Sequence, residues 1–191
     1  MPECVVELGE AIGRTARRAG QDMSIEAREI LGATVVGVGA TLMMDGWNLF
    51  LERVFRIPSL DYRLLGRWVL HMPEGTFRHS SIRSASPKPF ERTIGWMAHY
   101  SIGVGLALGF VVLTSGQAIA RPALLPALVY GIGTVVFPFF VLQPSLGLGF
   151  ASSRAPDPTR VRAKSLMTHT VFGVGLYVCS LCLSALLGAL G

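Results

Sequence analysis

Residues 30–50 read ILGATVVGVGATLMMDGWNLF, an apolar stretch whose single charged residue is Asp45. A helix needs about 20 apolar residues to cross the hydrocarbon core of a bilayer. The stretch therefore predicts a transmembrane helix, because the apolar region of a signal peptide is shorter. Asp45 lies near the end of this helix, where an ionisable side chain is costly and marks a candidate functional position.

Three further stretches meet the same criterion, at residues 94–114, 123–142 and 166–187. The composition agrees, since 51% of the chain is hydrophobic and only 15% is charged, against about 25% in soluble domains. No alternating pattern of a membrane β-barrel is visible. We predict an all-α membrane protein with four transmembrane helices, in which residues 1–29 form a polar tail and residues 30–191 a single membrane domain.

The basic residues lie mainly between the predicted helices. Twelve of the 17 Lys and Arg residues fall between the first and second helices or between the third and fourth. The positive-inside rule then predicts that the loop 51–93 is cytoplasmic and that both termini are periplasmic, in a bacterial inner membrane. No basic run is interleaved with aromatic residues, which argues against a nucleic-acid partner despite the net charge of +5.

The N-terminal stretch 1–22 weakens this charge bias. It is polar, contains three arginines and has no apolar partner, and Met23 stands just before the first predicted helix. The pattern is equally consistent with translation starting at Met1 or at Met23. A start at Met23 would leave only Arg28 and Arg121 on the periplasmic side.

A weak internal repeat relates the two halves of the chain. Residues 97–106 read MAHYSIGVGL and residues 167–176 read MTHTVFGVGL. The first and third predicted helices share Gly-x-Gly at 37–39 and 131–133, each followed by Pro-Ser-Leu at 58–60 and 144–146. The repeat predicts two tandem, similarly oriented helical hairpins, the parallel-repeat arrangement of some transporters.

Polar residues within the predicted helices fall at one depth. Counted along the helices at 1.5 Å per residue, Asp45, Asn48, His99 and His169 lie close to the cytoplasmic surface. Asn48 follows Asp45 by three residues, so both face the same way. We therefore expect these four residues to share one layer, with Tyr100 and Gln143 beside them.

Three interpretations of this layer remain open. Asp45 could bond a histidine or the backbone and lock the bundle. The layer could bind a small solute or ion for transport, with a proton-linked Asp and His pair, which is the interpretation that we favour. Alternatively, His99, His169 and Asp45 could hold a metal or haem in a redox protein. The sequence identifies no cofactor. The lipid bilayer is the expected partner, and four short helices are compatible with a homodimer.

The long loop carries further candidates. Residues 61–71 have the pattern of a short amphipathic helix that lies at the membrane interface. Arg67, His71, Arg78 and His79 lie in and just after it. These side chains could anchor the loop to anionic lipid headgroups, or they could form a lid over the polar layer.

Several stretches resemble the bacterial membrane family catalogued as domain of unknown function 2938. They include MDGWNLF at 44–50, RVFRIPSL at 53–60, GWMAHY at 95–100 and FPFF at 137–140. The resemblance covers about residues 24–187. It implies an inner-membrane protein with four helices, and it implies no activity.

Overall fold

The computed structural model describes the backbone of residues 2–190 and the side chains of residues 27–189, and this part is helical with no strand. Four helical segments, 27–55, 91–113, 124–145 and 158–189, are long and apolar enough to cross a membrane. The predicted all-α fold with four membrane helices is confirmed. The side chains of most of the predicted N-terminal tail, including Met23, lie outside the described residues.

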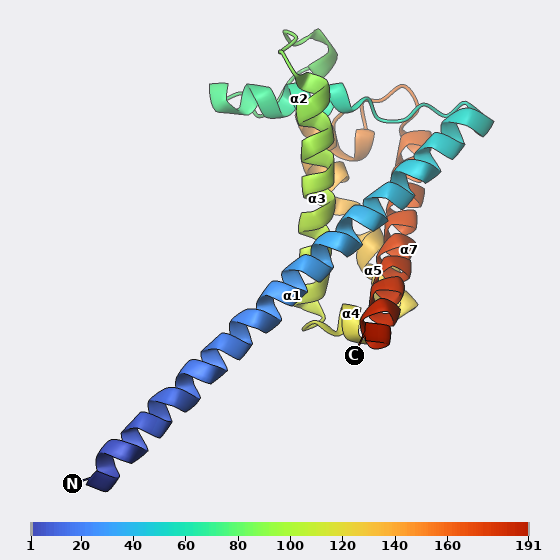
Figure 1. Cartoon of the computed structure of the whole chain (residues 1–191). Coiled ribbons are helices and arrows are strands. Elements are labelled where there is room, and N and C mark those ends of the chain that lie inside the picture. Colours follow the sequence, from blue (N-terminus) through green and yellow to red (C-terminus); the bar gives the residue numbers. More distant parts are fainter. Residues whose placement is uncertain (1, 191) are drawn as a thin grey trace.

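The four membrane segments form the body of the molecule, and shorter helices connect them (Figure 1). The first helix, α1, contacts both α3 and α7, and α5 packs against α7. The bounds in chain order are α1 Pro2–Phe55, α2 Tyr62–His71, η1 Met72–Glu74, η2 Ile82–Ser84, α3 Glu91–Leu113, α4 Gln117–Ala120, α5 Leu124–Gly133, η3 Pro138–Leu142, α6 Gln143–Ser145, η4 Phe150–Ser152 and α7 Pro158–Leu190.

Glycines let the long helices approach each other closely. A Cβ atom added to Gly37 of α1 would lie 2.7 Å from the Cα of Val104 in α3. In the second helix pair, a Cβ on Gly131 of α5 would lie 2.4 Å from the Cα of Gly173 in α7. Because lipid tails are as apolar as the side chains, such close backbone packing replaces the hydrophobic effect between membrane helices.

The third membrane segment is interrupted, which the sequence analysis did not predict. We expected one helix over 123–142, but α5 ends at Gly133 and the chain continues through the π-helical turn η3 and the short α6. Pro138 lacks an N–H group and cannot continue the preceding hydrogen-bond ladder. The Thr134 hydroxyl also donates to the Gly131 carbonyl (2.6 Å), which binds the backbone at the point of interruption.

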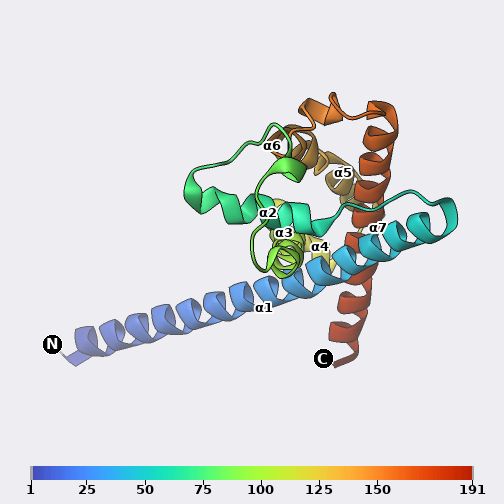
Figure 2. The same ribbon diagram turned by 90° about the horizontal axis from the view of Figure 1, so that it is seen from above.

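The predicted amphipathic helix is present as α2, and it lies across the beginning of α3 (Figure 2). Asp61 caps it by accepting from the Arg63 N–H (3.0 Å), and hydrogen bonding to Arg63 lowers the pKa of the Asp61 carboxyl. Its buried residues include Leu64, Leu65 and Gly66. This face of α2 packs against protein. A Cβ on Gly95 of α3 would lie 1.8 Å from the Tyr62 carbonyl oxygen, so the crossing needs glycine there.

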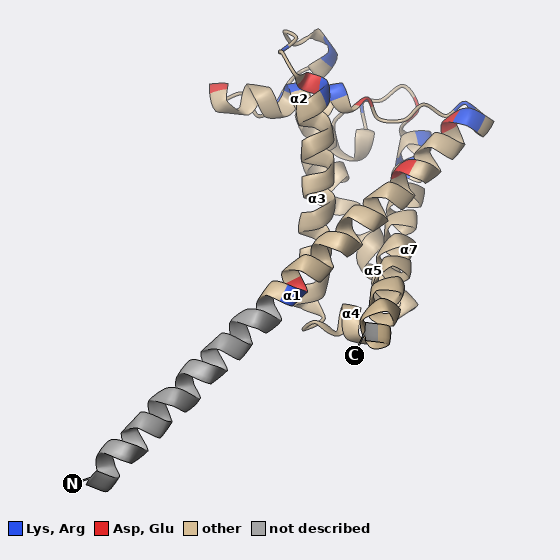
Figure 3. Ribbon diagram, in the orientation of Figure 1, with Lys and Arg blue, Asp and Glu red and all other residues tan. Residues whose placement is uncertain are grey.

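Charged residues gather where the segments 56–90 and 146–157 connect the helices, which we call the loop end (Figure 3). Arg28 and Glu29 lie toward the opposite end of the described part of α1. The predicted asymmetry of positive charge therefore runs along the bundle, from the loop end to the opposite end. The assignment of the loop end to the cytoplasm stays a prediction.

Candidate functional site

Asp45 lies at the centre of a group of hydrogen-bonded side chains that we call the Asp45 cluster. The hydroxyl of Tyr62 donates to Asp45 Oδ1 (2.9 Å), and Tyr100 donates to Oδ2 (3.1 Å). His99 Nε2 lies 3.0 Å from Oδ1 and 3.1 Å from the Tyr62 oxygen. An ionised carboxylate only accepts hydrogen bonds, so these donors satisfy it. The cluster joins α1, α2 and α3.

The crossing of α2 over α3 brings Tyr62 to the cluster. Tyr62 is the first residue of α2, and its ring stacks on the His99 imidazole with centroids 4.3 Å apart. Burial and the negative charge of Asp45 raise the pKa of Tyr62 far above its ordinary value. The phenol therefore keeps its proton and acts as a donor to Asp45.

A cavity of about 710 Å³ lies beside this cluster, between the α1–α3 pair and the α5–α7 pair. His99 lines it, whereas Asp45 is not among the lining residues. Most of the wall is apolar, with Ile102, Leu106 and Phe172 deep in the bundle. On α7 the wall runs from Arg160 to Phe172, about 18 Å along the helix axis at 1.5 Å per residue.

Contacts between the two helix pairs bound the cavity. Below it, the Tyr130 hydroxyl donates to the Leu106 carbonyl (2.7 Å), which ties α5 to α3. At the loop end, the His79 N–H donates to the Ser145 carbonyl (2.9 Å) and the Ile82 N–H to the Leu146 carbonyl (3.1 Å). The interrupted third segment supplies Pro138, Leu142 and Gln143 to the wall. Breaks of this kind within membrane helices occur where they line a cavity.

The predicted polar layer separates into groups around one cavity. His99, Asn48, Gln143 and His169 all line it, but His169 is not part of the Asp45 cluster. His169 Nδ1 instead lies 2.8 Å from Thr134 Oγ1. Thr168 Oγ1 donates to Asn48 Oδ1 (3.4 Å).

These separate hydrogen bonds bear on the metal interpretation. The side chains of Asp45 and His99 lie within hydrogen-bonding distance of each other, whereas His169 forms its hydrogen bond with Thr134. Among the residues that the structure describes, no group of three or more His, Cys, Asp or Glu side chains is arranged to hold a metal ion. The donor set that the sequence suggested, His99, His169 and Asp45, is thus not assembled.

Gln143 is a buried polar residue on the cavity wall. Its side chain is 6% exposed, and its Nε2 donates to Ser165 Oγ (3.3 Å). Its Oε1 is buried and has no hydrogen-bond partner among the described residues. An unpaired buried acceptor of this kind costs about 1–3 kcal/mol.

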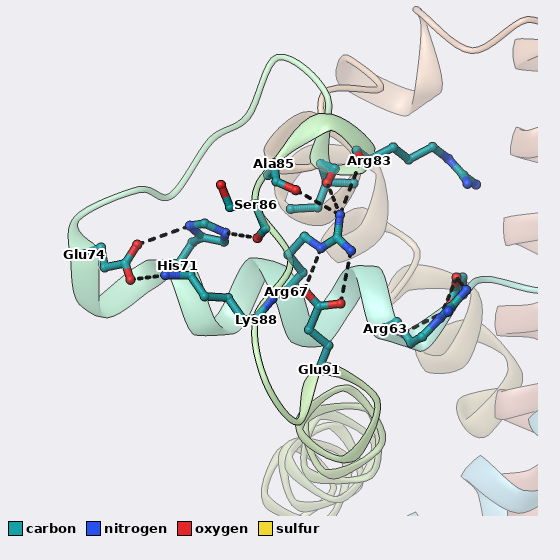
Figure 4. A network of polar contacts seen from close by, with 11 residues as sticks. Arg63, Arg67, His71, Glu74, Arg83, Ala85, Ser86, Lys88 and Glu91 are labelled. Carbon is teal, nitrogen blue, oxygen red and sulfur yellow. Dashed lines mark hydrogen bonds and ion pairs between the residues drawn. The ribbon is translucent and has the colours of Figure 1, made fainter.

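Arg67 holds the long loop in place rather than facing the cavity (Figure 4). Its guanidinium forms two hydrogen bonds with Glu91, at 2.7 and 3.1 Å. It also donates to the carbonyls of Ile82, Arg83 and Ala85. One side chain thereby ties α2, the loop and the first turn of α3 together.

The remaining loop candidates have different surroundings. His71 Nε2 lies 3.1 Å from the Ser86 carbonyl oxygen, and His71 Nδ1 lies 3.4 Å from Glu74 (Figure 4). Glu74 also pairs with Lys88, which lowers the pKa of the Glu74 carboxyl. His79 packs edge-on against His71 with centroids 5.2 Å apart, and Arg78 is exposed. None of the four loop candidates of the sequence analysis lines the cavity, which receives Leu65 and Trp68 from α2 instead.

Sequence reasoning missed four residues of the site. Tyr62, Thr134, Ser165 and Thr168 contact the predicted polar residues, yet each lies in a stretch read only as apolar helix or loop. Ser165 could have been found, because it lies four residues before His169 on the fourth helix, whereas the adjacent Thr168 points in a different direction. Tyr62 and Thr134 carry no such spacing signal.

Comparisons with known proteins agree with the membrane fold and assign no activity. No curated protein and no solved structure matches the chain significantly. A family model described as "Protein of unknown function (DUF2938)" matches residues 34–183, which is most of the chain. The four membrane helices and the site described above all fall within or at the edges of this range. The chain therefore belongs to the DUF2938 family of proteins of unknown function.

Proposed function

We propose that the protein binds a small, mainly apolar solute in the cavity between its two helix pairs, as a membrane transport protein. The observation that carries the proposal is the cavity itself, with apolar walls and a volume of about 710 Å³. Ligand sites in proteins are typically about 300–1,000 Å³ and mostly apolar, with a few placed polar groups. His99, Asn48, Gln143 and His169 are among the polar groups here.

The position of the cavity supports a role in transport. It extends from Arg160 and Lys164 at the loop end to Leu106 and Phe172 deep in the bundle. The interrupted third segment forms part of its wall, as discontinuous helices do at transporter binding sites. A solute held there would lie between one membrane surface and the middle of the bilayer.

In this proposal Asp45 is a structural residue rather than a solute ligand. Its two oxygens already accept from Tyr62, Tyr100 and His99. The cluster fixes His99 on the cavity wall and leaves Asp45 itself away from it. Loss of Asp45 would therefore act on binding through the position of His99.

Filling the cavity tests the proposal. Gly105 lines the cavity, and a Cβ added there meets nothing within 4 Å, so Gly105→Leu would occupy free space without a backbone clash. Gly46 of α1 is equally unobstructed and does not line the cavity, which makes Gly46→Leu the matched control. Binding of a ring-fluorinated para-hexylanisole to the protein in lipid nanodiscs would be followed by fluorine NMR, with empty nanodiscs as blank.

We expect the wild type and Gly46→Leu to bind the probe and Gly105→Leu to lose most of this binding. Transport would then be measured as uptake of the same probe into proteoliposomes, with Gly105→Leu as the inactive reference. Equal binding of the probe by wild type and Gly105→Leu would overturn the proposed function.

A further inference from the structure

The hydrogen bonds of His169 determine which ring nitrogen carries its proton. Thr134 Oγ1 donates its one hydrogen to the Gly131 carbonyl (2.6 Å). His169 Nδ1 lies 2.8 Å from Thr134 Oγ1. A hydroxyl has a single proton to donate, so Thr134 must accept from His169 and Nδ1 must carry the hydrogen.

His169 Nε2 is then a free acceptor. No ion pair with His169 occurs among the described residues, and an unpaired buried cation is costly, so the imidazole is neutral. A neutral imidazole with its proton on Nδ1 presents a lone pair on Nε2. This nitrogen has no hydrogen-bond partner in the part of the chain that the structure describes. Unlike Gln143 Oε1, it is not enclosed by protein, so it remains accessible.

A second unpaired acceptor belongs to Gln143, but protein encloses it. Gln143 Nε2 is used by Ser165, which leaves Gln143 Oε1 without a donor. Ser165 precedes His169 by four residues on α7, so their side chains lie on the same face of the helix, about 6 Å apart at Cβ. Both His169 and Gln143 line the cavity. The wall there combines apolar surface with one accessible acceptor that lacks a donor, His169 Nε2.

We infer that the cavity selects an apolar solute that donates a hydrogen bond, namely a lipophilic alcohol or phenol, through His169 Nε2. The inference rests on the proposed function and specifies its solute class. A hydroxyl that reaches this nitrogen satisfies an acceptor that is otherwise unpaired, whereas an ether of the same shape cannot do so. Thr134 acts as a positioning residue because it holds the ring proton on Nδ1.

A matched pair of probes isolates this preference. Ring-fluorinated para-hexylphenol donates a hydrogen bond, and its methyl ether, the anisole used above, does not. In wild-type protein we expect the phenol to bind about tenfold more tightly than the ether, after correction for partition into empty nanodiscs. The two probes share their apolar body, so the ratio reports the hydroxyl alone.

Three variants connect the ratio to the residues. His169→Phe keeps a ring and removes both nitrogens, so the phenol preference should fall to about onefold while ether binding persists and shows an intact cavity. Thr134→Val removes the acceptor for Nδ1 and should reduce the preference, whereas Thr134→Ser keeps the hydroxyl and should retain it. The ether serves in each variant as the internal check on folding.

The outcomes separate the two proposals. If the ether binds and Gly105→Leu abolishes that binding, but phenol and ether bind equally, the inferred solute class is wrong and the proposed function stands. A phenol preference that survives in His169→Phe would also overturn the inference. If neither probe binds wild-type protein above the blank, the proposed function itself falls.

Discussion

At the scale of single residues, the Asp45 carboxylate holds three helices together. It is 18% exposed and accepts from Tyr62 of α2 and from His99 and Tyr100 of α3. Hydrogen bonds to a charged acceptor are stronger than neutral ones, although in membrane proteins the measured gains are modest. The cluster therefore stabilises the loop end of the bundle and fixes the His99 ring.

Replacing Asp45 by Asn should destabilise the protein. Asn keeps the shape but removes the negative charge and one acceptor oxygen, so we expect a loss of about 1–2 kcal/mol in the free energy of unfolding. Thermal unfolding in mild detergent, followed by circular dichroism, measures it. Glu52→Gln is the control, because it removes an exposed carboxylate from the same helix and should change little. A midpoint for Asp45→Asn equal to that of the control would contradict the role of the cluster.

The sequence predicted the depth of the polar residues better than their partners. Counting along a helix gives depth, so Asp45 and His99 were expected in one layer, and in the structure they lie within hydrogen-bonding distance. Rotation of each helix about its axis decides which side chains meet, and that rotation depends on packing between helices. For this reason the pairing of His169 with Thr134 could not be derived from spacing alone.

At the scale of elements, the crossing of α2 over α3 positions the cluster. The backbones meet at Gly66 and Gly95, where an added Cβ would lie 1.9 Å from the Glu91 carbonyl oxygen and 1.8 Å from the Tyr62 carbonyl oxygen, respectively. Both contacts involve backbone atoms, which cannot yield as a flexible side chain can. The crossing therefore depends on the absence of a side chain at either position.

Gly95→Ala should separate α2 from α3. We expect destabilisation of about 1–3 kcal/mol, as for other overpacked sites, and displacement of Tyr62 from Asp45. Gly105→Ala on the same helix is the control, since its added Cβ meets nothing within 4 Å. Unfolding midpoints in detergent compare the two variants. Similar unfolding midpoints for Gly95→Ala and Gly105→Ala would show that α2 can move away from α3 without loss of stability.

Arg67→Lys should loosen the loop between α2 and α3. Lys cannot reproduce the paired hydrogen bonds to Glu91 together with those to three carbonyl oxygens. We expect faster amide hydrogen exchange over residues 72–90, about tenfold or more, measured by mass spectrometry. Arg63→Lys alters an Arg of the same helix that pairs with Asp61 at the surface, and it should leave that exchange unchanged. Equal amide hydrogen exchange over residues 72–90 in both variants would show that the Arg67 contacts do not hold the loop.

Hydropathy predicted the number of membrane segments but not the interruption of the third. The measure counts apolar side chains and takes no account of backbone hydrogen bonds, so residues 123–142 scored as one helix. The cues were Pro138, which lacks a donor, and Thr134, whose hydroxyl bonds the Gly131 carbonyl. Proline in a membrane helix is tolerated often enough that the sequence alone did not decide the outcome.

At the scale of the whole molecule, two helix pairs meet along α1 and α7. Within the pairs, Gly37 packs against α3 and Gly131 against α7, and these glycines correspond in the proposed internal repeat. The correspondence supports the repeat, which stays a prediction. Between the pairs, a Cβ on Gly175 would lie 2.8 Å from the Cα of Ala40, so a close approach also joins the two halves.

Gly175→Leu should therefore weaken the association of the halves. If the chain is divided after Ser115, between α3 and α4, we expect the two co-expressed fragments to purify together because each keeps its own helix pair. Gly175→Leu in the second fragment should prevent this, whereas Gly188→Leu, with no atom near its added Cβ, should not. Affinity purification through a tag on the first fragment measures recovery of the second. Full recovery with Gly175→Leu would contradict the contact.

The Asp45 cluster also bears on how the chain enters the membrane. Asp45 is synthesised before Tyr62, His99 and Tyr100, so α1 leaves the ribosome with a carboxylate that has none of its partners. An Asp at the centre of an inserting helix disfavours its release into lipid by about 3 kcal/mol, and Asp45, nearer the helix end, carries part of this cost. The first helix therefore becomes firmly seated only when α3 arrives from the translocon, and nascent chains that stall before His99 should hold α1 more loosely than the finished protein.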